Sequence, residues 1–455
     1  MIQKTTEDNL LIGKEKKVTN PFIVIKKPQE NLGFFLNMTI EKLHHIFLNS
    51  SGVCTDSRKI EKDNIFFALK GDNFNGNLFA EQAIQEGCSY AIIDSKEFQK
   101  NKQYILVDDV LECLQKLSTY HRKQLNCPVI GITGTNGKTT TKELMYAVLN
   151  TEYKTIATQG NFNNHIGVPL TLLSTPLDTE ILIVEMGANR PGEIAFLSNI
   201  AQPNFGIITN IGKAHLEGFG GYKGVIKTKS ELYHYIKSNG GKLFVNAKDE
   251  LLLNLSKNIE RTTYSNNSKF LSANPFVQFS CEETEISSQL IGSYNYPNLA
   301  AACCIGKYFG ITIRNCKKAI ENYTPTNNRS QVEKSNKGNT LILDAYNANP
   351  CSMRVAIESL QHLSTTNKIA IIGDMLELGN DSLQEHQEIV ELLKASNFQS
   401  VFLVGEEFQK TTNSFSSFAN TNKLNNWLQS NPITDSTILL KGSRGIRLED
   451  LKTKL

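Results

Sequence analysis

A loop bracketed by glycines is the strongest chemical signal in this chain of 455 residues. The loop runs from Gly134 through Thr135, Asn136 and Gly137 to Lys138, between an apolar run and a helix-compatible segment. Glycine allows successive backbone N–H groups to point inward, and a helix N-terminus favours negative charge. This arrangement predicts a phosphate cradle for a nucleoside triphosphate.

The two residues at the end of the loop have side chains suited to phosphate chemistry. Lys138 can reach the β- and γ-phosphates, and the hydroxyl of Thr139 can bind magnesium. The strict eight-residue motif has glycine where Ile132 stands, so the general match begins at Gly134. A plain surface turn is the alternative interpretation of the same residues.

Two further polar residues follow apolar runs typical of buried parallel strands. Glu185 ends the run that begins at Ile181, and His215 follows the run 205–209. Ligands gather at the carboxyl ends of parallel strands, so Glu185 is a candidate magnesium ligand. For His215, a capping or core histidine is the alternative, although its place after a second strand favours a ligand role.

Apolar runs alternate with helical patterns along much of the chain, which predicts an α/β fold with parallel sheets. In the last third, strands are expected at 340–343, 368–372, 401–404 and 437–440, in a doubly wound sheet. The length suggests about three domains of ~150 residues. Turn-rich segments predict the boundaries, which give an extension 1–37 with little fixed structure and domains 38–126, 127–323 and 324–455. Choice of an upstream start codon would also explain the extension.

Composition excludes several classes of function. A net charge of +3, from 48 basic and 45 acidic residues without long blocks, gives no reason to expect nucleic acid or membrane partners. Nine cysteines without a C-x-x-C pair argue against a disulfide framework and a structural zinc site. No apolar run approaches the ~20 residues that span a bilayer. We expect a cytoplasmic protein without stable membrane association, and a monomer.

The loop Thr-Gly-Thr-Asn-Gly-Lys-Thr-Thr also resembles the Mur ligase family, the ATP-dependent amide-forming enzymes of cell-wall precursor synthesis. Further segments resemble the family in the same order from Met38 to the C-terminus, namely 55–58, 71–77, 161–169, 181–187, 210–220, 227–233, 292–302, 344–350 and 373–379. The resemblance implies a small α/β domain for the UDP sugar, a central ATP-binding domain and a C-terminal Rossmann-like domain that closes over the substrates.

The resemblance also implies roles for individual residues. The nucleotide would be bound by the loop and by residues farther along the chain, which are Gly134, Thr135, Asn136, Gly137, Lys138, Thr139, Thr140, Asn295, Asn298, Arg329 and Asp344. Magnesium would be held by Thr139, Glu185, His215 and Lys229, the last as a carbamate formed with carbon dioxide. The substrates would be bound by Ser57, Arg58, Asn75, Gly76, Asn163, Asn164, Tyr346, Asn347 and Lys441. Lys138, Glu185, His215 and Lys229 would carry the catalysis.

Two motifs point to one activity within the family. The stretches Asp-x-Tyr-Asn-Ala-Asn-Pro from Asp344 and Gly-Asp-Met-Leu-Glu-Leu-Gly from Gly373 look like those of the ligase that adds D-alanyl-D-alanine to a UDP-N-acetylmuramoyl tripeptide. The third residue of that tripeptide stays open between lysine and a diaminopimelate. The alternatives are another Mur ligase, a folylpolyglutamate synthase, and a nucleotide-driven ATPase or switch that ligates nothing.

Overall fold

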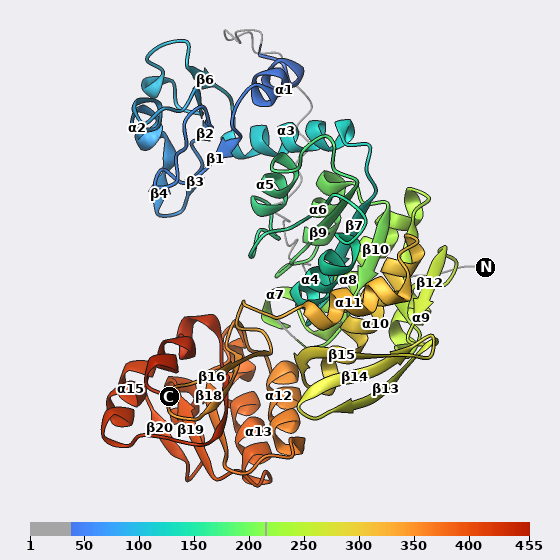
Figure 1. Ribbon diagram of the computed structural model, residues 1–455. Helices are drawn as coiled ribbons and strands as arrows, with labels where there is room; N and C mark the ends of the chain where they lie inside the picture. Colours follow the sequence, from blue (N-terminus) through green and yellow to red (C-terminus); the bar gives the residue numbers. More distant parts are fainter. Residues whose placement is uncertain (1–37, 214–215) are drawn as a thin grey trace, which may run out of the picture. The chain divides into compact units, whose positions relative to one another are not determined.

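The computed structural model describes residues 38–213 and 216–455, and Figure 1 shows their arrangement. The predicted extension 1–37 and the predicted ligand His215 lie outside the described residues. No helix within the described ranges is long and apolar enough to cross a membrane.

The N-terminal part forms a small α/β unit (Figure 1, blue). Its elements are α1 (Ile40–Leu48), β1 (Val53–Cys54), β2 (Ile65–Phe67), β3 (Lys70–Gly71), β4 (Phe74–Asn75), α2 (Ala80–Gln85), β5 (Tyr90–Ile93), β6 (Tyr104–Leu106) and α3 (Val110–Gln124). Four parallel strands pair in the order β1-β2-β5-β6, and β3 and β4 form a separate hairpin. As the helical spacing predicts, Leu43 and Phe47 of α1 are buried.

Helix α3 connects this unit to the central part of the chain. Its Leu114 and Leu117 belong to the same core cluster as Leu173, which lies well beyond the predicted boundary at 126. His121 bonds through Nδ1 to Nε2 of His44 at 3.0 Å and through Nε2 to a backbone carbonyl at 2.8 Å. The apolar core is therefore continuous across the predicted boundary, and the boundary itself stays a prediction.

The central sheet has six parallel strands. They are β7 (Val129–Thr133), β8 (Thr155–Ala157), β9 (Ile181–Glu185), β10 (Phe205–Ile208), β11 (Lys242–Asn246) and β12 (Arg261–Tyr264), and they pair in the order β12-β11-β10-β7-β9-β8. All five residues of β7 and of β9 are buried, because helices cover both faces. Since β7 lies between β9 and β10, the segments that follow these three strands meet at one edge of the sheet.

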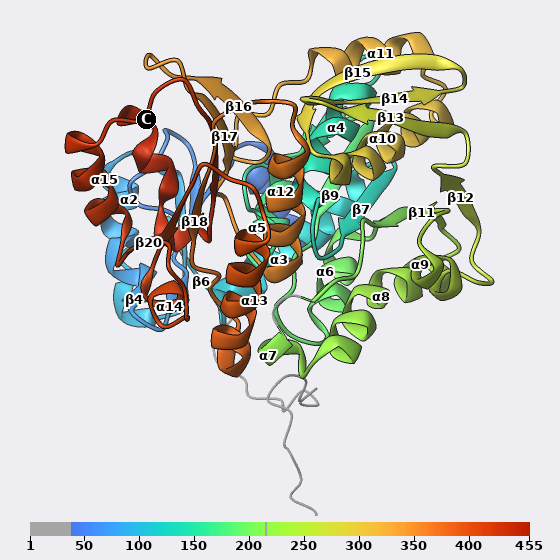
Figure 2. The ribbon, with the colours of Figure 1, turned by 90° about the horizontal axis from the view of Figure 1, so that it is seen from below.

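Helices cover the two faces of the central sheet. The helices of this part of the chain are α4 (Lys138–Leu149), α5 (Gly167–Leu173), α6 (Glu193–Ala201), α7 (Leu216–Phe219), α8 (Tyr222–Ser238), α9 (Glu250–Leu255), α10 (Tyr296–Tyr308) and α11 (Ile313–Asn322). Figure 2 shows α4, α10 and α11 on one side of the central strands, and α6 and α8 on the other. Two separate apolar clusters fill the two layers, in agreement with that view. This doubly covered sheet holds the predicted phosphate loop at its edge.

An antiparallel sheet absent from the sequence predictions follows the central sheet. It consists of β13 (Ser268–Ala273), β14 (Phe276–Cys281) and β15 (Thr284–Ile291). Its buried Val277, Phe279 and Ile286 join the cluster around α10 and α11. Strand β14 alternates between more and less buried residues, as expected for a sheet with one face on a core.

The C-terminal part forms a second six-stranded sheet. Its elements are β16 (Gln331–Lys334), β17 (Thr340–Asp344), α12 (Pro350–His362), β18 (Lys368–Gly373), α13 (Ser382–Lys394), β19 (Ser400–Val404), α14 (Glu406–Gln409), β20 (Ser416–Phe418), α15 (Thr421–Ser430) and β21 (Thr437–Lys441). The order is β16-β17-β21-β18-β19-β20, with only β16 antiparallel to its neighbour among these pairs. The α/β fold class and the four predicted strands are confirmed; β16 and β20 were not predicted.

Candidate active site

The predicted phosphate loop joins the end of β7 to the start of α4. Gly134 and Gly137 have φ of +145° and +77°, values that L side chains rarely adopt. A Cβ on Gly134 would lie 2.0 Å from the Thr209 hydroxyl, so the loop packs too closely for any other residue. The loop therefore has the backbone that a phosphate cradle requires, with α4 directly behind it.

The Lys138 ammonium is close to the loop that it follows. It donates to the carbonyls of Gly134 at 2.8 Å and Thr135 at 3.1 Å. Burial lowers its pKa, the Glu185 carboxylate raises it, and Arg329 lowers it. This cation is thus placed where phosphate oxygens could take over from loop carbonyls as its partners.

Glu185 at the end of β9 faces Thr139 at the start of α4. One carboxylate oxygen, Oε1, accepts from the Thr139 hydroxyl at 3.2 Å and from Nδ2 of Asn163 at 2.9 Å. The other, Oε2, is buried and has no hydrogen-bond partner within the described ranges. A buried carboxylate oxygen without a partner is costly, so this atom fits a cation that binds beside it.

Lys229 lies on α8 and is only 3% exposed. It is therefore not a solvent-facing lysine, although the nearby Glu231 in the sequence would suggest an exposed Lys-Glu helix face. Burial, followed by the charge of Lys138, lowers the pKa of Lys229 to about 7. A substantial fraction of its amine is therefore uncharged at neutral pH. Glu231 accepts from two backbone N–H groups at the start of α6, at 2.9 Å each, so it has partners of its own.

Two strand ends of the C-terminal sheet bring an ion pair to the same region. Asp344 ends β17 and pairs in register with Lys441, which ends β21. The Lys441 ammonium, 1% exposed, donates to Oδ2 of Asp344 at 2.7 Å. Beside them, the Arg329 guanidinium lies 3.8 Å from the ring centre of Tyr346, and its Nε is buried without a partner in the described structure.

Asn295 and Asn298, which are predicted to bind the nucleotide, form a buried amide network. Asn298 donates from Nδ2 to Oδ1 of Asn295 at 3.0 Å, and Asn295 donates to the Ser330 hydroxyl at 3.0 Å. The Thr141 hydroxyl donates to Oδ1 of Asn298 at 3.1 Å. Both asparagines line the same cavity as the phosphate loop, and nucleotide binding by their amides stays a prediction.

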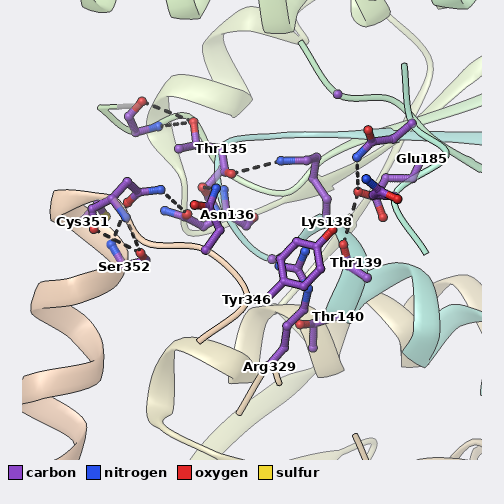
Figure 3. A pocket seen from close by; sticks show the side chains of 18 of the residues that line it. Thr135, Asn136, Lys138, Thr139, Thr140, Glu185, Arg329, Tyr346, Cys351 and Ser352 are labelled. Carbon is purple, nitrogen blue, oxygen red and sulfur yellow. Dashed lines mark hydrogen bonds between the residues drawn. The ribbon is translucent and has the colours of Figure 1, made fainter. Parts of the chain in front are cut away.

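One cavity of about 630 Å³ joins these groups, and Figure 3 shows it with the phosphate loop, Arg329 and Tyr346 around it. The predicted site residues that line it are Thr135, Asn136, Gly137, Lys138, Thr139, Thr140, Asn163, Asn164, Glu185, Asn295, Asn298, Arg329, Asp344, Tyr346, Asn347 and Lys441. Gly134, the first residue of the loop, and Lys229, on α8, lie outside the lining. The volume is within the range of small-molecule sites.

The residues predicted to hold the UDP sugar do not line this cavity. Arg58 is held instead by a two-pronged ion pair with Asp56, with both bonds at 2.8 Å. The side-chain oxygen Oδ1 of Asn75 accepts from the backbone N–H and from Nδ2 of Asn77, and a Cβ on Gly76 would collide with the backbone at Leu69. Ser57, Arg58, Asn75 and Gly76 lie in the N-terminal unit and outside the lining of this cavity, and their role in UDP binding stays a prediction.

Two polar residues have structural roles that the sequence did not suggest. Asp374 accepts from the backbone N–H groups of Glu407 at 2.9 Å and Phe408 at 3.0 Å, so it caps α14. Asn164 accepts from the N–H of Gly167 at 2.9 Å and caps α5, although it also lines the cavity. A polar residue after a strand can thus serve the next helix as well as a ligand.

Sequence reasoning missed several residues at the phosphate loop. Asn210 accepts from the backbone N–H of Asn136 at 3.0 Å, and Asn349 donates to the side-chain oxygen of Asn136 at 2.8 Å. The Asn-Pro pair at 349–350 is a recognisable start signal for a helix, so a helix N-terminus at this strand end could have been found.

Comparison with known proteins agrees with this geometry. Residues 49–122 match the Mur ligase family catalytic domain, 132–306 the Mur ligase middle domain, and 328–444 the Mur ligase glutamate ligase domain. A UDP-N-acetylmuramoyl-tripeptide–D-alanyl-D-alanine ligase from Bacillus subtilis is 34% identical over 94% of this chain and 98% of its own length. The chain belongs to the Mur ligase family. Its loop, its Glu185 and its Asp344–Lys441 pair are therefore parts of a Mur ligase.

Solved structures of Mur ligases have the same fold. MurF from Acinetobacter baumannii is 30% identical, with a TM-score of 0.77 over 88% of this chain and 92% of that one. MurF from Thermotoga maritima in complex with ADP is 27% identical, with a TM-score of 0.78 over 90% of this chain and 98% of that one. These similarities extend over nearly the whole described part of this Mur ligase.

Proposed function

We propose that this Mur ligase uses ATP to join D-alanyl-D-alanine to UDP-N-acetylmuramoyl-tripeptide in peptidoglycan precursor synthesis. The observation that carries the proposal is one cavity lined by the phosphate loop on one side and by the Asp344–Lys441 pair on the other. The names of relatives that match over most of the chain, such as those from Bacillus subtilis and Escherichia coli, support the choice of substrates.

The reaction has two steps. The terminal carboxylate of the tripeptide attacks the γ-phosphorus of ATP, the bond to the β-phosphate oxygen breaks, and an acyl phosphate and ADP form. The amine of D-alanyl-D-alanine then attacks the acyl carbon, phosphate leaves, and the ammonium loses a proton to give the amide. Lys138 and the loop N–H groups offset the negative charge that would otherwise keep a carboxylate away from a triphosphate.

Magnesium fits the residues around Glu185. Magnesium usually binds proteins through one or two carboxylates together with substrate phosphates. This agrees with the finding that no group of three or more His, Cys, Asp or Glu side chains in the described ranges could hold a metal by itself. We assign Thr139 and Glu185 to the ion, together with the predicted His215 and a carbamate on Lys229. When bound, magnesium supplies positive charge to the phosphate oxygens.

The remaining predicted residues divide between ATP and the two substrates that are joined. We assign Asn295, Asn298, Arg329 and Asp344 to ATP. The peptide ends of the substrates are assigned to Asn163, Asn164, Tyr346, Asn347 and Lys441, and the UDP group to Ser57, Arg58, Asn75 and Gly76. The predicted domain boundaries fit this division of ligands, and we keep the predictions of a cytoplasmic monomer.

Phosphate release by the purified protein tests the proposal. The assay contains ATP, magnesium and a UDP-tripeptide with lysine or diaminopimelate, with and without D-alanyl-D-alanine. We expect release that depends on both the tripeptide and the dipeptide, and a UDP-pentapeptide detected by mass spectrometry. Release with D-glutamate or a diamino acid as the amine would favour another Mur ligase, and ligation of glutamate to a folate would indicate a folylpolyglutamate synthase. Release without any carboxylate substrate would indicate an ATPase or switch.

A further inference from the structure

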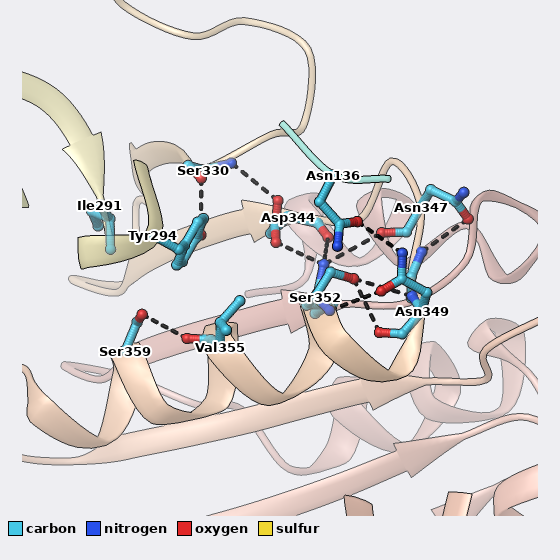
Figure 4. Close-up of polar contacts among 12 residues, drawn as sticks. Asn136, Ile291, Tyr294, Ser330, Asp344, Asn347, Asn349, Ser352, Val355 and Ser359 are labelled. Carbon is cyan, nitrogen blue, oxygen red and sulfur yellow. Dashed lines mark hydrogen bonds and ion pairs between the residues drawn. The ribbon is translucent and has the colours of Figure 1, made fainter. Parts of the chain in front are cut away.

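Asn349, the residue before α12, uses its side chain in two directions (Figure 4). Its Oδ1 accepts from the backbone N–H of Ser352 at 2.9 Å, and the Ser352 hydroxyl accepts from the backbone N–H of Asn349 at 3.1 Å. These two bonds form a capping box at the start of α12. Nδ2 of Asn349 donates to Oδ1 of Asn136, in the phosphate loop, at 2.8 Å. The cap of one helix is therefore bonded to the loop that begins another.

Asn136 cannot move without moving the loop around it. Its backbone N–H donates to Oδ1 of Asn210 at 3.0 Å. Its carbonyl accepts from the Thr209 hydroxyl at 2.6 Å and from Nδ2 of Asn210 at 3.0 Å. The backbone of Asn136 is held by the segment after β10. A shift of the phosphate loop would therefore move the Asn136 side chain and its hydrogen bond to Asn349.

Asn349 also lies close in sequence to residues assigned to the substrates. Tyr346 and Asn347 come just before it, and Lys441 donates to the Asn347 carbonyl at 3.3 Å. A shift of the α12 N-terminus would therefore displace groups that line the cavity between the loop and the C-terminal sheet. Any ligand that changes the phosphate loop should bias α12, and the bias must be reciprocal.

We propose that Asn349 is a positioning residue that couples the nucleotide at the phosphate loop to the N-terminus of α12 through Asn136. The identity of the substrates that bind beside α12 rests on the function proposed above, whereas the coupling itself needs only the nucleotide. Loss of one neutral hydrogen bond should weaken the coupling about 2- to 10-fold.

Amide hydrogen exchange of the full chain tests this proposal without any ligation. Exchange is followed in the peptide that covers the first turn of α12, with magnesium and a non-hydrolysable ATP analogue added or omitted. Asn349→Ser keeps a good capping residue but is too short to reach Asn136. Asn420→Ser is the matched control, because Asn420 caps α15 by accepting from the N–H of Lys423 at 3.1 Å. We expect the analogue to slow exchange in the wild-type chain and in Asn420→Ser, and to do so much less in Asn349→Ser.

A double-mutant cycle tests whether Asn349 acts through Asn136. The analogue affinity of Asn136→Ala, Asn349→Ser and the double variant is measured by calorimetry. We expect the double variant to be no weaker than Asn136→Ala by itself, because both changes remove the same bond. Independent, multiplying effects would overturn the proposal, as would an exchange response in Asn349→Ser equal to that of the wild type, or no response in the wild type. A chain that shows the coupling but forms no UDP-pentapeptide would refute the proposed substrates and leave the coupling standing.

Discussion

The Lys441 ammonium lies 2.7 Å from the Asp344 carboxylate at the ends of two neighbouring parallel strands. Lys441 is almost completely buried, and Asp344 is its ion-pair partner. Lys441→Met should lower the free energy of unfolding by about 1–3 kcal/mol, because Asp344 would lose its cation. Denaturant unfolding measures the loss. The double variant Asp344→Asn/Lys441→Met should recover part of it, and a double variant less stable than Lys441→Met would contradict this account.

Lys138 should matter for turnover and not for the fold. Lys138→Ala removes a cation whose bonds within the described ranges are to two loop carbonyls, so its melting temperature should stay close to that of the wild type. The kcat should fall by at least about 100-fold, because the charge of the transferring phosphoryl group would lose a fixed cation. Lys423→Ala, which removes an exposed lysine of α15, is the control. Ligation at a normal rate by Lys138→Ala would contradict the site assignment.

Lys229 should be a carbamate in the active enzyme. Its amine bonds to carbon dioxide only when uncharged, and the pKa of about 7 makes that form common at neutral pH. Lys229→Ala should lose most activity, and acetate or formate should restore part of it by occupying the vacated carboxylate position. The control is Lys227→Ala, two residues earlier on α8 and exposed. Normal turnover by Lys229→Ala without added carboxylate would dispose of the carbamate.

The buried pair His44–His121 should make the stability of the chain depend on pH. Burial, and for His44 also the charge of His121, lowers both pKa values from 6.5. The unfolded histidines therefore bind protons more readily, and stability must fall as the pH drops through about 6.5. Urea unfolding at pH 7.5 and pH 5 should show this loss. His44→Leu should reduce it, whereas the control His45→Gln, on the exposed side of α1, should keep it.

Local sequence signals predicted the elements that hold the phosphate loop. The continuous apolar run before Glu185 identified β9, and the loop glycines marked positions that have positive φ. The order of the strands within the sheet could not be predicted from local sequence signals. That β7 lies between β9 and β10, which brings Glu185 and Asn210 to one loop, depends on contacts distant in sequence.

Other features were hidden because one residue type serves several purposes. Asp374 follows a strand as a ligand would, yet its carboxylate caps α14. The strands β13–β15 form no clear apolar run, because buried residues alternate with less buried ones along β14 and most of β15, and β13 has no buried residue. Lys229 resembles a solvent-facing lysine in sequence, and only packing shows that it is buried.

The continuity of the apolar core through α3 bears on how this enzyme can be dissected. A fragment that ended at Asn126 would carry Leu114 and Leu117 without Leu173, their partner in the same cluster. The bared apolar surface would favour aggregation of the fragment. Ligand screening against the N-terminal unit therefore needs a polypeptide that extends at least through Leu173, or the whole chain.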